Sequence, residues 1–219
     1  MTQAHYVAEV DPEALLDPDG KPWRGIRADT LPMSGTPLGL QPTDAIRASW
    51  AGRPVGAVES VDVSAVHDGR TLAFRLEWSD ADENREMADT TAFVDAGAVA
   101  LPSVAEAPLV TMGAPGAAVN LWYWRADEES GRHVVAEGIG TSRTLDRELV
   151  RTRGIWKEGR WRVVIARALR VQTGEPVVQL RPGGGTQFAV AVWEGGRSER
   201  AGLKAFSGGW RTLALAAEK

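Results

Sequence analysis

Residues 61–78, which read VDVSAVHDGRTLAFRLEW, contain the clearest local pattern in this chain of 219 residues. Apolar side chains at positions 72, 74, 76 and 78 alternate with small or polar ones. A period of two is typical of a half-buried strand. Val61 and Val63 alternate with polar neighbours in the same way, and HDGR at residues 67–70 has the composition of a tight turn. The stretch therefore predicts a β-hairpin.

Further strands are expected because other short apolar runs are separated by turns rich in glycine and proline. They fall at residues 119–124, 133–135, 155–156, 161–169, 188–193 and 210–215. A turn at residues 157–160 joins two of these runs, which predicts a second hairpin. Helical candidates are few and short, at residues 11–16, 82–88 and 146–151. Many short strands with few helices indicate an all-β protein, and we expect an antiparallel β-sandwich.

Length and composition fit one globular domain that spans residues 1–219, because 43% of the residues are apolar and 25% are charged. The first fifty residues contain turn-forming pairs such as Leu31-Pro32, Thr36-Pro37 and Gln41-Pro42. Proline prevents long helices there. We expect about residues 1–50 to form an irregular arm. Its proline-rich part, Asp17 to Pro42, is expected to pack on a partner subunit or to wrap around the sandwich.

The composition excludes several classes of protein. A net charge of −4 is unlike the basic surface of nucleic-acid-binding proteins. The absence of cysteine excludes disulfides, thiolate zinc sites and cysteine-ligated iron–sulfur clusters, and three histidines leave little material for a histidine-rich metal site. No apolar run approaches the ~18–20 residues that span a bilayer. The N-terminus lacks the basic-then-apolar pattern of a signal peptide. We expect no nucleic-acid partner, no membrane span and no signal peptide on this chain.

Lys204 differs in its surroundings from the other three lysines. Residues 201–206 read AGLKAF, whereas Lys21 and Lys157 lie in polar turns and Lys219 is terminal. In an ordinary structural role, the stem of Lys204 would pack on apolar surface, or its amine would form a buried ion pair. In a functional role, burial would lower the pKa of the amine, which could then act as a base or as a metal ligand.

Met112 lies in VTMGAPG, residues 110–116, among turn-forming residues rather than on a periodic apolar face. Methionine commonly fills gaps in a core. In a loop of this kind, its thioether could instead serve as a soft metal ligand. The nine tryptophans additionally suggest a tryptophan-rich pocket, since tryptophan lines ligand pockets as well as cores.

Other chemically capable residues are interpreted as structural. The glycine-rich residues 138–140 and 183–185 do not lie between a strand and a helix, as a phosphate-binding loop would, so we expect turns. Three carboxylates follow Trp78 and are expected in a solvated loop, and two histidines are expected to have surface or structural roles. These five residues are Asp80, Asp82, Glu83, His67 and His133.

Four short blocks follow one another along the chain. They are FVD at 93–95 leading to LP at 101–102, MG at 112–113 followed by VNLWYW at 119–124, AEG at 136–138, and FAVAVWEGG at 188–196 followed by ERAGLK at 199–204. In this order and spacing they resemble the haem b-binding gamma subunit of ethylbenzene dehydrogenase and related type II molybdoenzymes of the dimethyl sulfoxide reductase family. The similarity extends from about Val61 to Trp210. One departure is Leu101, where the family often has phenylalanine, which affects packing rather than ligand binding.

The resemblance implies a β-sandwich that holds one haem b between a methionine and a lysine, which correspond to Met112 and Lys204 as axial ligands of the iron. With both axial positions filled there is no open site for substrate, so the implied role is electron transfer rather than catalysis. The implied partners form a heterotrimeric complex with this chain. They are a molybdopterin-containing catalytic alpha subunit and an iron–sulfur beta subunit, with a soluble electron acceptor such as a cytochrome c outside the complex. The implied location is the periplasm, reached by export together with a signal-bearing catalytic subunit.

The residues themselves leave two alternatives open. The chain could be a lectin-like or small-ligand-binding β-sandwich in which tryptophans stack on the ligand. It could also be a free-standing enzyme that uses Lys204 as a base.

Overall fold

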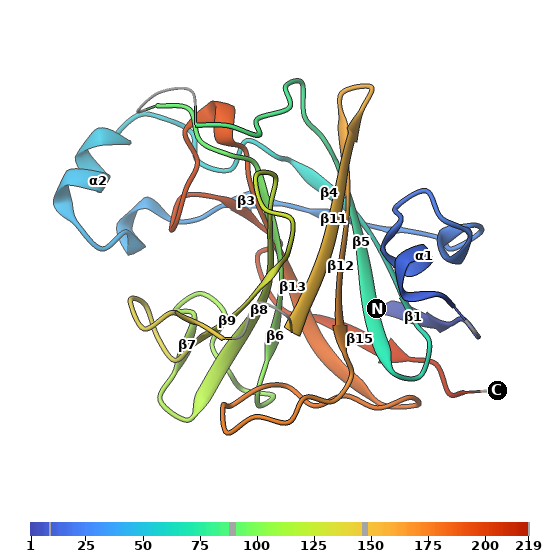
Figure 1. Cartoon of the computed structure of the whole chain (residues 1–219). Coiled ribbons are helices and arrows are strands. Elements are labelled where there is room, and N and C mark those ends of the chain that lie inside the picture. Colours follow the sequence, from blue (N-terminus) through green and yellow to red (C-terminus); the bar gives the residue numbers. More distant parts are fainter. Residues whose placement is uncertain (9, 88–90, 146–148, 219) are drawn as a thin grey trace.

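The computed structural model describes residues 1–8, 10–87, 91–145 and 149–218. Two β-sheets face each other and are joined through β13 (Gly185–Trp193) (Figure 1). Residues 185–188 of this strand pair with β15 (Arg211–Leu215), and residues 189–193 pair with β6 (Ala96–Pro102). The all-β, sandwich-like fold expected from the sequence is confirmed.

The first sheet has the order β15, β1 (Thr2–Tyr6), β4 (Ser60–His67), β5 (Thr71–Ser79), β12 (Arg160–Ala168) and β11 (Val150–Lys157), and β2 (Asp29–Pro32) also pairs with β4. The second sheet has the order β13, β6, β8 (Ala117–Arg125), β9 (Arg132–Ala136) and β10 (Arg143–Thr144). Three two-residue strands flank it: β3 (Ser34–Gly35), β7 (Gly113–Ala114) and β14 (Ala205–Phe206). Within the described strands, β1 alone departs from antiparallel pairing, since it lies parallel to both β15 and β4.

The hairpin predicted over residues 61–78 is confirmed as β4 and β5. The Asp68 carboxylate closes its turn by accepting hydrogen bonds from the backbone N–H groups of Arg70 and Thr71, and Gly69 supplies a φ of 89°. The alternating side chains of β5 point into the core between the sheets, where Phe74 is fully buried. The opposite face is also covered, because Val66 packs against the N-terminal segment. The strands are therefore buried on both faces at this end of the hairpin.

The other strands expected from apolar runs also form. Residues 119–124, 133–135 and 188–193 lie in β8, β9 and β13, and the second predicted hairpin is the pair β11 and β12. The final strand, expected over residues 210–215, is β15. Period-two alternation and the flanking turns were sufficient signals for these elements.

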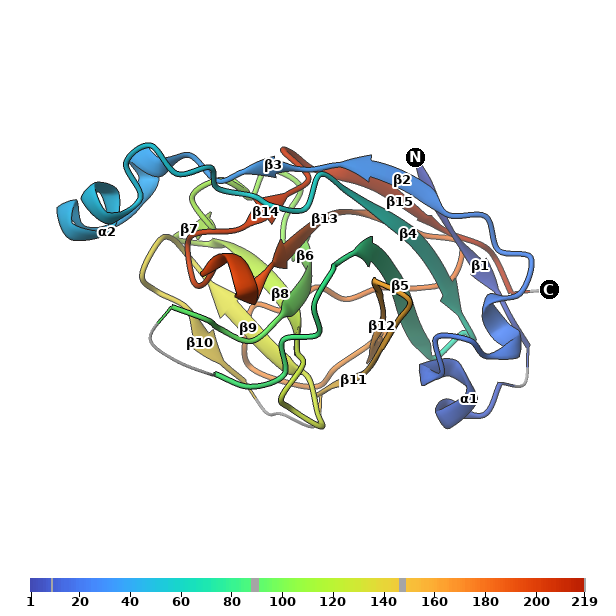
Figure 2. The ribbon, with the colours of Figure 1, turned by 90° about the horizontal axis from the view of Figure 1, so that it is seen from above.

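The arm expected over about residues 1–50 is only partly irregular. β1 lies inside the first sheet, between β15 and β4, and α1 (Pro12–Leu16) begins at Asp11, whose side chain accepts a hydrogen bond from the Glu13 N–H. The helical turn expected at residues 11–16 is thus confirmed. The remaining arm crosses the sandwich through η1 (Lys21–Trp23), β2, β3 and η2 (Leu38–Leu40). It ends in α2 (Asp44–Ser49), at the opposite end of the molecule from α1 (Figure 2).

The helix expected over residues 82–88 is wrong for the described residues 82–87, which form bends and irregular backbone. The reason is tertiary: the Asn84 N–H donates to the Asp95 carboxylate, and the Asn84 side-chain oxygen accepts from the Gly196 N–H. Of the candidate helix at residues 146–151, residues 146–148 lie outside the described residues, while Val150 and Arg151 belong to β11. Among the helices described, none is long and apolar enough to span a membrane.

Four of the nine tryptophans fill the core between the sheets rather than a pocket. Trp78, Trp124 and Trp161 contact one another, with ring centroids 4.8–6.4 Å apart, and Trp122 packs edge-on against Phe74. All four tryptophans are at most 2% exposed. The expectation of a tryptophan-rich pocket is therefore wrong for these residues, because a large apolar ring gains more from burial between the sheets than from solvent exposure.

Candidate functional site

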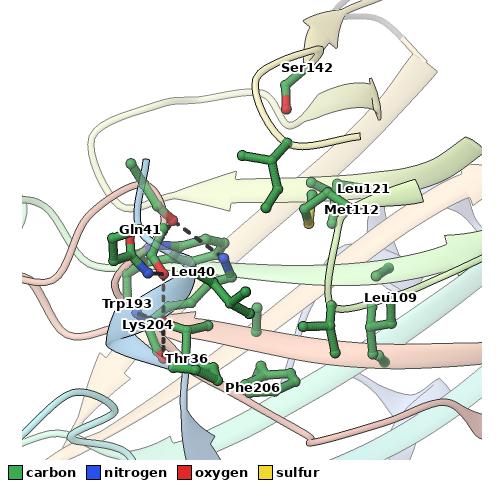
Figure 3. A pocket seen from close by; sticks show the side chains of 18 of the residues that line it. Thr36, Leu40, Gln41, Leu109, Met112, Leu121, Ser142, Trp193, Lys204 and Phe206 are labelled. Atoms are coloured by element: carbon green, nitrogen blue, oxygen red, sulfur yellow. Dashed lines mark hydrogen bonds between the residues drawn. The ribbon is translucent and has the colours of Figure 1, made fainter. Parts of the chain in front are cut away.

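A pocket of about 370 Å³ lies on the outer face of the second sheet, away from the tryptophan core (Figure 3). Its floor comes from β6, β8 and β13, and its walls come from the Met112 turn, the loop that precedes β14, and the arm. Met112 and Lys204 both line it, and Figure 3 shows them on different walls. The structure thus brings together the two residues that the sequence singles out.

Alternation along the strands explains why there is room for a pocket here. In β13, Phe188, Val190 and Val192 point into the core between the sheets. Successive side chains of a strand point to opposite faces, so Ala189 and Ala191 point outward, and Ala100 of β6 lies beside them on the pocket floor. Alanine leaves a shallow apolar surface on which a flat ligand can lie.

Met112 is held by a tight turn that precedes β7. Its backbone N–H donates to the Leu109 carbonyl at 2.9 Å, and its carbonyl accepts from the Gly138 N–H at 3.0 Å. The next residue, Gly113, has a φ of 91°, and a Cβ atom there would lie 2.6 Å from the Ala136 carbonyl oxygen. Only glycine fits this position, so the sequence Met112-Gly113 fixes where the thioether enters the pocket.

Lys204 is held by the arm. The Thr36 N–H donates to the Lys204 carbonyl at 3.0 Å, and the Thr36 hydroxyl donates to the Gly202 carbonyl at 2.5 Å. The Gln41 amide donates to the same Gly202 carbonyl at 3.1 Å. These bonds connect residues that are distant in the sequence, and they anchor the loop from which the Lys204 side chain enters the pocket.

A buried carboxylate braces the other end of this loop. Glu199 is 1% exposed and accepts hydrogen bonds from the backbone N–H groups of Gly56, Ala57 and Glu194 at 2.6, 2.9 and 3.2 Å. Burial raises the pKa of Glu199, while these three donors and Lys204 act in the opposite direction. Because its oxygens are occupied by backbone donors, Glu199 fixes the loop without forming a close ion pair with Lys204 in the described structure.

The amine of Lys204 lies in apolar surroundings. Its Nζ atom is 5.4 Å from the ring centroid of Trp193 and 3.4 Å from the Ala201 carbonyl oxygen. Burial lowers the pKa of Lys204 to about 8, against the weaker opposing attraction of Glu199. A substantial fraction of this amine is therefore neutral at moderately alkaline pH, and a neutral amine has a lone pair to donate.

The donor set limits what the pocket can bind. Its described lining offers a thioether and an amine, and no histidine is among those residues. A thioether is a soft ligand and an uncharged amine is a borderline one, a pair that suits an iron centre better than a hard cation such as Ca²⁺. The surrounding surface is apolar, with Leu109, Leu121 and Phe206 around the space between the two donors. These residues fit a planar apolar cofactor that carries iron.

Several lining residues were not foreseen. The arm contributes Thr36, Leu40 and Gln41, but its proline-rich sequence carries no periodic signal. The glycine-rich turn expected at residues 138–140 contributes Ile139, and Ser142 follows shortly after it. Leu40 and Ile139 are 40% and 48% exposed despite being large and apolar. Exposed apolar side chains at a pocket rim are a signal that only the folded structure provides.

Asp80 departs from the expected solvated loop, although Asp82 and Glu83 are exposed as expected. Asp80 is 5% exposed, and burial together with the charge of Asp95 raises its pKa to about 7. His67 and His133 are fully buried and lie outside the described pocket lining, in agreement with structural roles.

Residues 22–148 and 139–205 match the sequence profile of a family described as ethylbenzene dehydrogenase. The chain belongs to the ethylbenzene dehydrogenase family. The match includes both Met112 and Lys204, together with the part of the arm that walls the pocket. The family resemblance noted in the sequence is therefore confirmed.

Several similar proteins are named as subunits of oxidoreductases. The chain is 31% identical to the "Putative respiratory nitrate reductase heme subunit ORF7" of Haloferax mediterranei, over 94% of this chain and 73% of that protein. It is 36% identical to the chlorate reductase subunit gamma of Ideonella dechloratans, over 72% of this chain and 65% of that one. It is 26% identical to the dimethylsulfide dehydrogenase subunit gamma of Rhodovulum sulfidophilum, over 90% and 82%.

The fold of this family member is also similar to that of a carbohydrate-binding module of family 9 from Caldicellulosiruptor kristjanssonii, solved with glucose. The TM-score is 0.53 over 99% of this chain and 96% of that chain, and the sequence identity is 12%. At this identity the likeness concerns the β-sandwich alone.

Proposed function

We propose that this chain is the haem b-binding gamma subunit of a molybdenum and iron–sulfur oxidoreductase complex, in which it transfers electrons. The observation that carries this proposal is the pocket, where Met112 and Lys204 enter one apolar space from different walls. Its relatives include a protein named as a heme subunit and two named as gamma subunits, which supports the same role.

Met112 and Lys204 would hold the haem iron as its two axial ligands. Haem b supplies one-electron redox chemistry when it is bound. As a ligand, the Met112 thioether would favour the ferrous state and so would raise the reduction potential. Lys204 must lose its proton to donate its lone pair, and its apolar surroundings assist by disfavouring the ammonium form. Two protein ligands leave no open coordination position for a substrate, so the expected role is electron transfer.

The finer parts of the proposal concern the complex. We place this chain in a heterotrimer with a molybdopterin-containing alpha subunit and an iron–sulfur beta subunit, in the periplasm. A soluble acceptor such as a cytochrome c would exchange electrons with it. The names of the chlorate reductase and dimethylsulfide dehydrogenase gamma subunits support an assembly of several chains.

The sugar-binding alternative is weaker because of where the tryptophans lie. Trp78, Trp122, Trp124 and Trp161 are buried between the sheets and cannot stack on a ligand from solvent. Trp193 does line the pocket, but it is only 7% exposed and its indole N–H donates to the Ala201 carbonyl. A catalytic base at Lys204 would need a substrate site that leaves the amine free. The thioether of Met112 in the same pocket has no role in that chemistry.

The deciding experiment is an absorption spectrum of the full chain reconstituted with haem, compared with the Lys204→Ala variant. We expect a low-spin spectrum for the unchanged protein and a five-coordinate high-spin spectrum, or loss of haem, for the variant. Lys157→Ala is a matched control, since its side chain is 62% exposed in a turn. A low-spin spectrum that is identical in all three proteins would contradict ligation by Lys204.

A further inference from the structure

Three carboxylates meet at one edge of the sandwich, apart from the haem pocket. Asp80 directly follows β5, Asp95 directly precedes β6, and Glu194 directly follows β13. One oxygen from each lies within 4.8 Å of the other two. The cluster therefore joins the end of a strand in the first sheet to the ends of two strands in the second.

Asp95 is fixed in place as a carboxylate. It is fully buried and accepts three hydrogen bonds, from the Gly195 N–H at 2.9 Å, the Asn84 N–H at 2.9 Å and the Trp161 indole at 3.0 Å. Burial raises the pKa of Asp95, while the donors on both of its oxygens act in the opposite direction and fix its position. The cluster is therefore built around a rigidly held carboxyl group.

The burial of Asp80 is a second observation that points to a ligand at the cluster. It is only 5% exposed, and its Oδ1 atom accepts a hydrogen bond from the Asp82 N–H at 3.2 Å. Its Oδ2 atom is buried and accepts no hydrogen bond of standard geometry from the described residues, although the Trp78 indole N–H, which is buried and also without such a partner, acts to lower the pKa of Asp80. A buried carboxylate oxygen without a donor is energetically costly, and this side chain lies beside two further carboxylates. A cation between the three carboxylates would satisfy this oxygen and offset their charges.

The described side chains do not neutralise the cluster. Among the described residues, the cluster forms one ion pair, between Glu194 Oε2 and Arg197 Nε at 3.4 Å. The Arg197 side chain is 75% exposed, so this pair is largely solvated. The nearby Arg85 is bound elsewhere, to Glu83 and to the Ala126 carbonyl. Burial first, and the charge of Asp95 second, raise the pKa values of both Asp80 and Glu194 to about 7, which is the expected response of carboxylates without a counterion.

We propose that Asp80, Asp95 and Glu194 bind one divalent cation, with Ca²⁺ as the best-suited ion, and that this ion ties the two sheets together. All three donors are carboxylate oxygens, which hard cations prefer. Three oxygens that all lie within 4.8 Å of one another are close enough to share one ion, because Ca²⁺–oxygen bonds are about 2.3–2.6 Å long. The Glu194 side chain is 14% exposed, so water can complete the coordination from that side.

A backbone contact connects the cation site to the loop that carries Lys204. Glu194 precedes η4 (Gly195–Arg197), and its backbone N–H donates to Glu199, the carboxylate that braces the Lys204 loop. The cation site and the pocket are nevertheless separate, because the three carboxylates are absent from the described pocket lining.

The test uses the full chain after removal of metals with EDTA. Calorimetric titration with CaCl₂ should give one site per chain, and the melting temperature should rise with the logarithm of the Ca²⁺ concentration because the ion binds only the folded state. Tb³⁺ should replace Ca²⁺ and show luminescence sensitised by Trp161, whose indole N–H donates a hydrogen bond to Asp95. MgCl₂ should bind more weakly, since Mg²⁺ demands shorter and more regular bonds.

The Asp80→Asn variant keeps the size of the side chain and should lose both the Ca²⁺-dependent melting shift and the Tb³⁺ signal. Glu158→Gln is the control, because Glu158 is 83% exposed in a turn. If Asp80→Asn does not fold, Glu194→Gln at the exposed side of the cluster makes the same comparison. Haem absorbance, recorded in parallel, should be unchanged in these variants. Loss of the Ca²⁺ response would therefore test the cation site without testing the haem proposal.

Two results would overturn the proposal. One is the absence of Ca²⁺ binding at concentrations up to about 1 mM, near the weak end for extracellular calcium sites. The other is an equal response to Ca²⁺ in the unchanged protein and in Asp80→Asn. Either would mean that the carboxylates share protons instead of a metal ion.

Discussion

The backbone of Met112 has a φ of 60°, in the left-handed region that residues other than glycine seldom adopt. Such a conformation is unfavourable by about 1–3 kcal/mol and persists where the surrounding structure enforces it. Here the hydrogen bonds to Leu109 and Gly138, together with Gly113, hold the turn. Strain at this residue is consistent with a side chain that is positioned for binding.

Replacement of Met112 by histidine should retain haem but lower its reduction potential. Imidazole stabilises ferric iron better than a thioether does. Potentiometric titration followed by absorbance measures the change. Met87→His is a control, because Met87 is 65% exposed and lies outside the described pocket lining. Equal potentials in Met112→His and in the unchanged protein would show that Met112 is not an axial ligand.

Binding of haem should depend on pH through Lys204. Burial lowers the pKa of this amine to about 8 in the empty pocket, and only the neutral form can bind iron. Below pH 8 the neutral fraction falls, so the apparent affinity for haem should decrease by up to about tenfold per pH unit, and it should level off above pH 8. Once bound, the low-spin form should persist through neutral pH and be lost on acidification.

Titration of the apoprotein with haem at a series of pH values measures this dependence. The Lys204→Ala variant should show a weaker and flatter profile. A low-spin signal that appears only near the ordinary lysine pKa of ~10.4 would contradict ligation by Lys204 at neutral pH.

At the scale of elements, the pocket depends on short segments that have little stability of their own. β3, β7 and β14 have two residues each and are held by their neighbours, β14 between β13 and β3, and β7 against β8. The loop of Lys204 and the turn of Met112 lie next to these strands. The geometry of the site is therefore a property of pairing between elements.

Two glycines near Met112 allow a matched test of this dependence. Both Gly113 and Gly116 have positive φ, but a Cβ at Gly113 would lie 2.6 Å from a carbonyl oxygen, whereas one at Gly116 would meet nothing within 4 Å. Gly116→Ala should destabilise the protein by about 1–2 kcal/mol through backbone strain alone. Gly113→Ala should destabilise it by more than about 3 kcal/mol and should shift the haem spectrum, because it displaces the Met112 turn.

Urea denaturation gives the free energies of unfolding, and absorbance reports on the haem. Equal losses of stability with an unchanged spectrum in both variants would mean that the close approach at Gly113 does not position Met112.

At the scale of the whole molecule, polar groups between the sheets affect stability. His133 of β9 is fully buried, and one of its ring nitrogens lies 3.2 Å from the Asn120 side-chain oxygen. Arg167 of β12 is 1% exposed, and its guanidinium stacks 4.7 Å from the Trp122 ring centroid. Burial first, and the positive charge of Arg167 second, lower the pKa of His133 to about 4.

This shift predicts a loss of stability in acid. Between pH 6.5 and about 4 the unfolded chain takes up a proton on His133 while the folded chain does not, so the free energy of unfolding falls as the pH falls. At pH 4, the lowered pKa of His133 reduces the free energy of unfolding by at most about 3 kcal/mol. His133→Gln should remove it while retaining a donor for Asn120.

Urea denaturation at pH 7 and at pH 4.5 measures the difference between the two proteins. His5→Gln is the control, since His5 is exposed on β1. A difference in stability between the unchanged protein and His133→Gln that is the same at both pH values would contradict the role given to His133.

Local pattern in the sequence determined the strands and the orientation of their faces. Alternation in residues 61–78 and 188–193 specifies which side chains point inward, because the period of a strand is fixed by backbone geometry. The unusual flanks of Lys204 and Met112 were also visible, since one lies among apolar residues and the other among turn formers. The resemblance to the ethylbenzene dehydrogenase family connected the two.

Tertiary structure alone decided what lies beside what. β1 enters the first sheet although its buried residues include only the small side chains of Thr2 and Ala4, which give a weak apolar signal. Asp80 is buried while Asp82 is exposed, because strand ends from both sheets converge on the first and not on the second. The arm forms a wall of the pocket through bonds to Gly202 and Lys204. Side-chain periodicity is a local property, whereas these contacts depend on how distant strands pair.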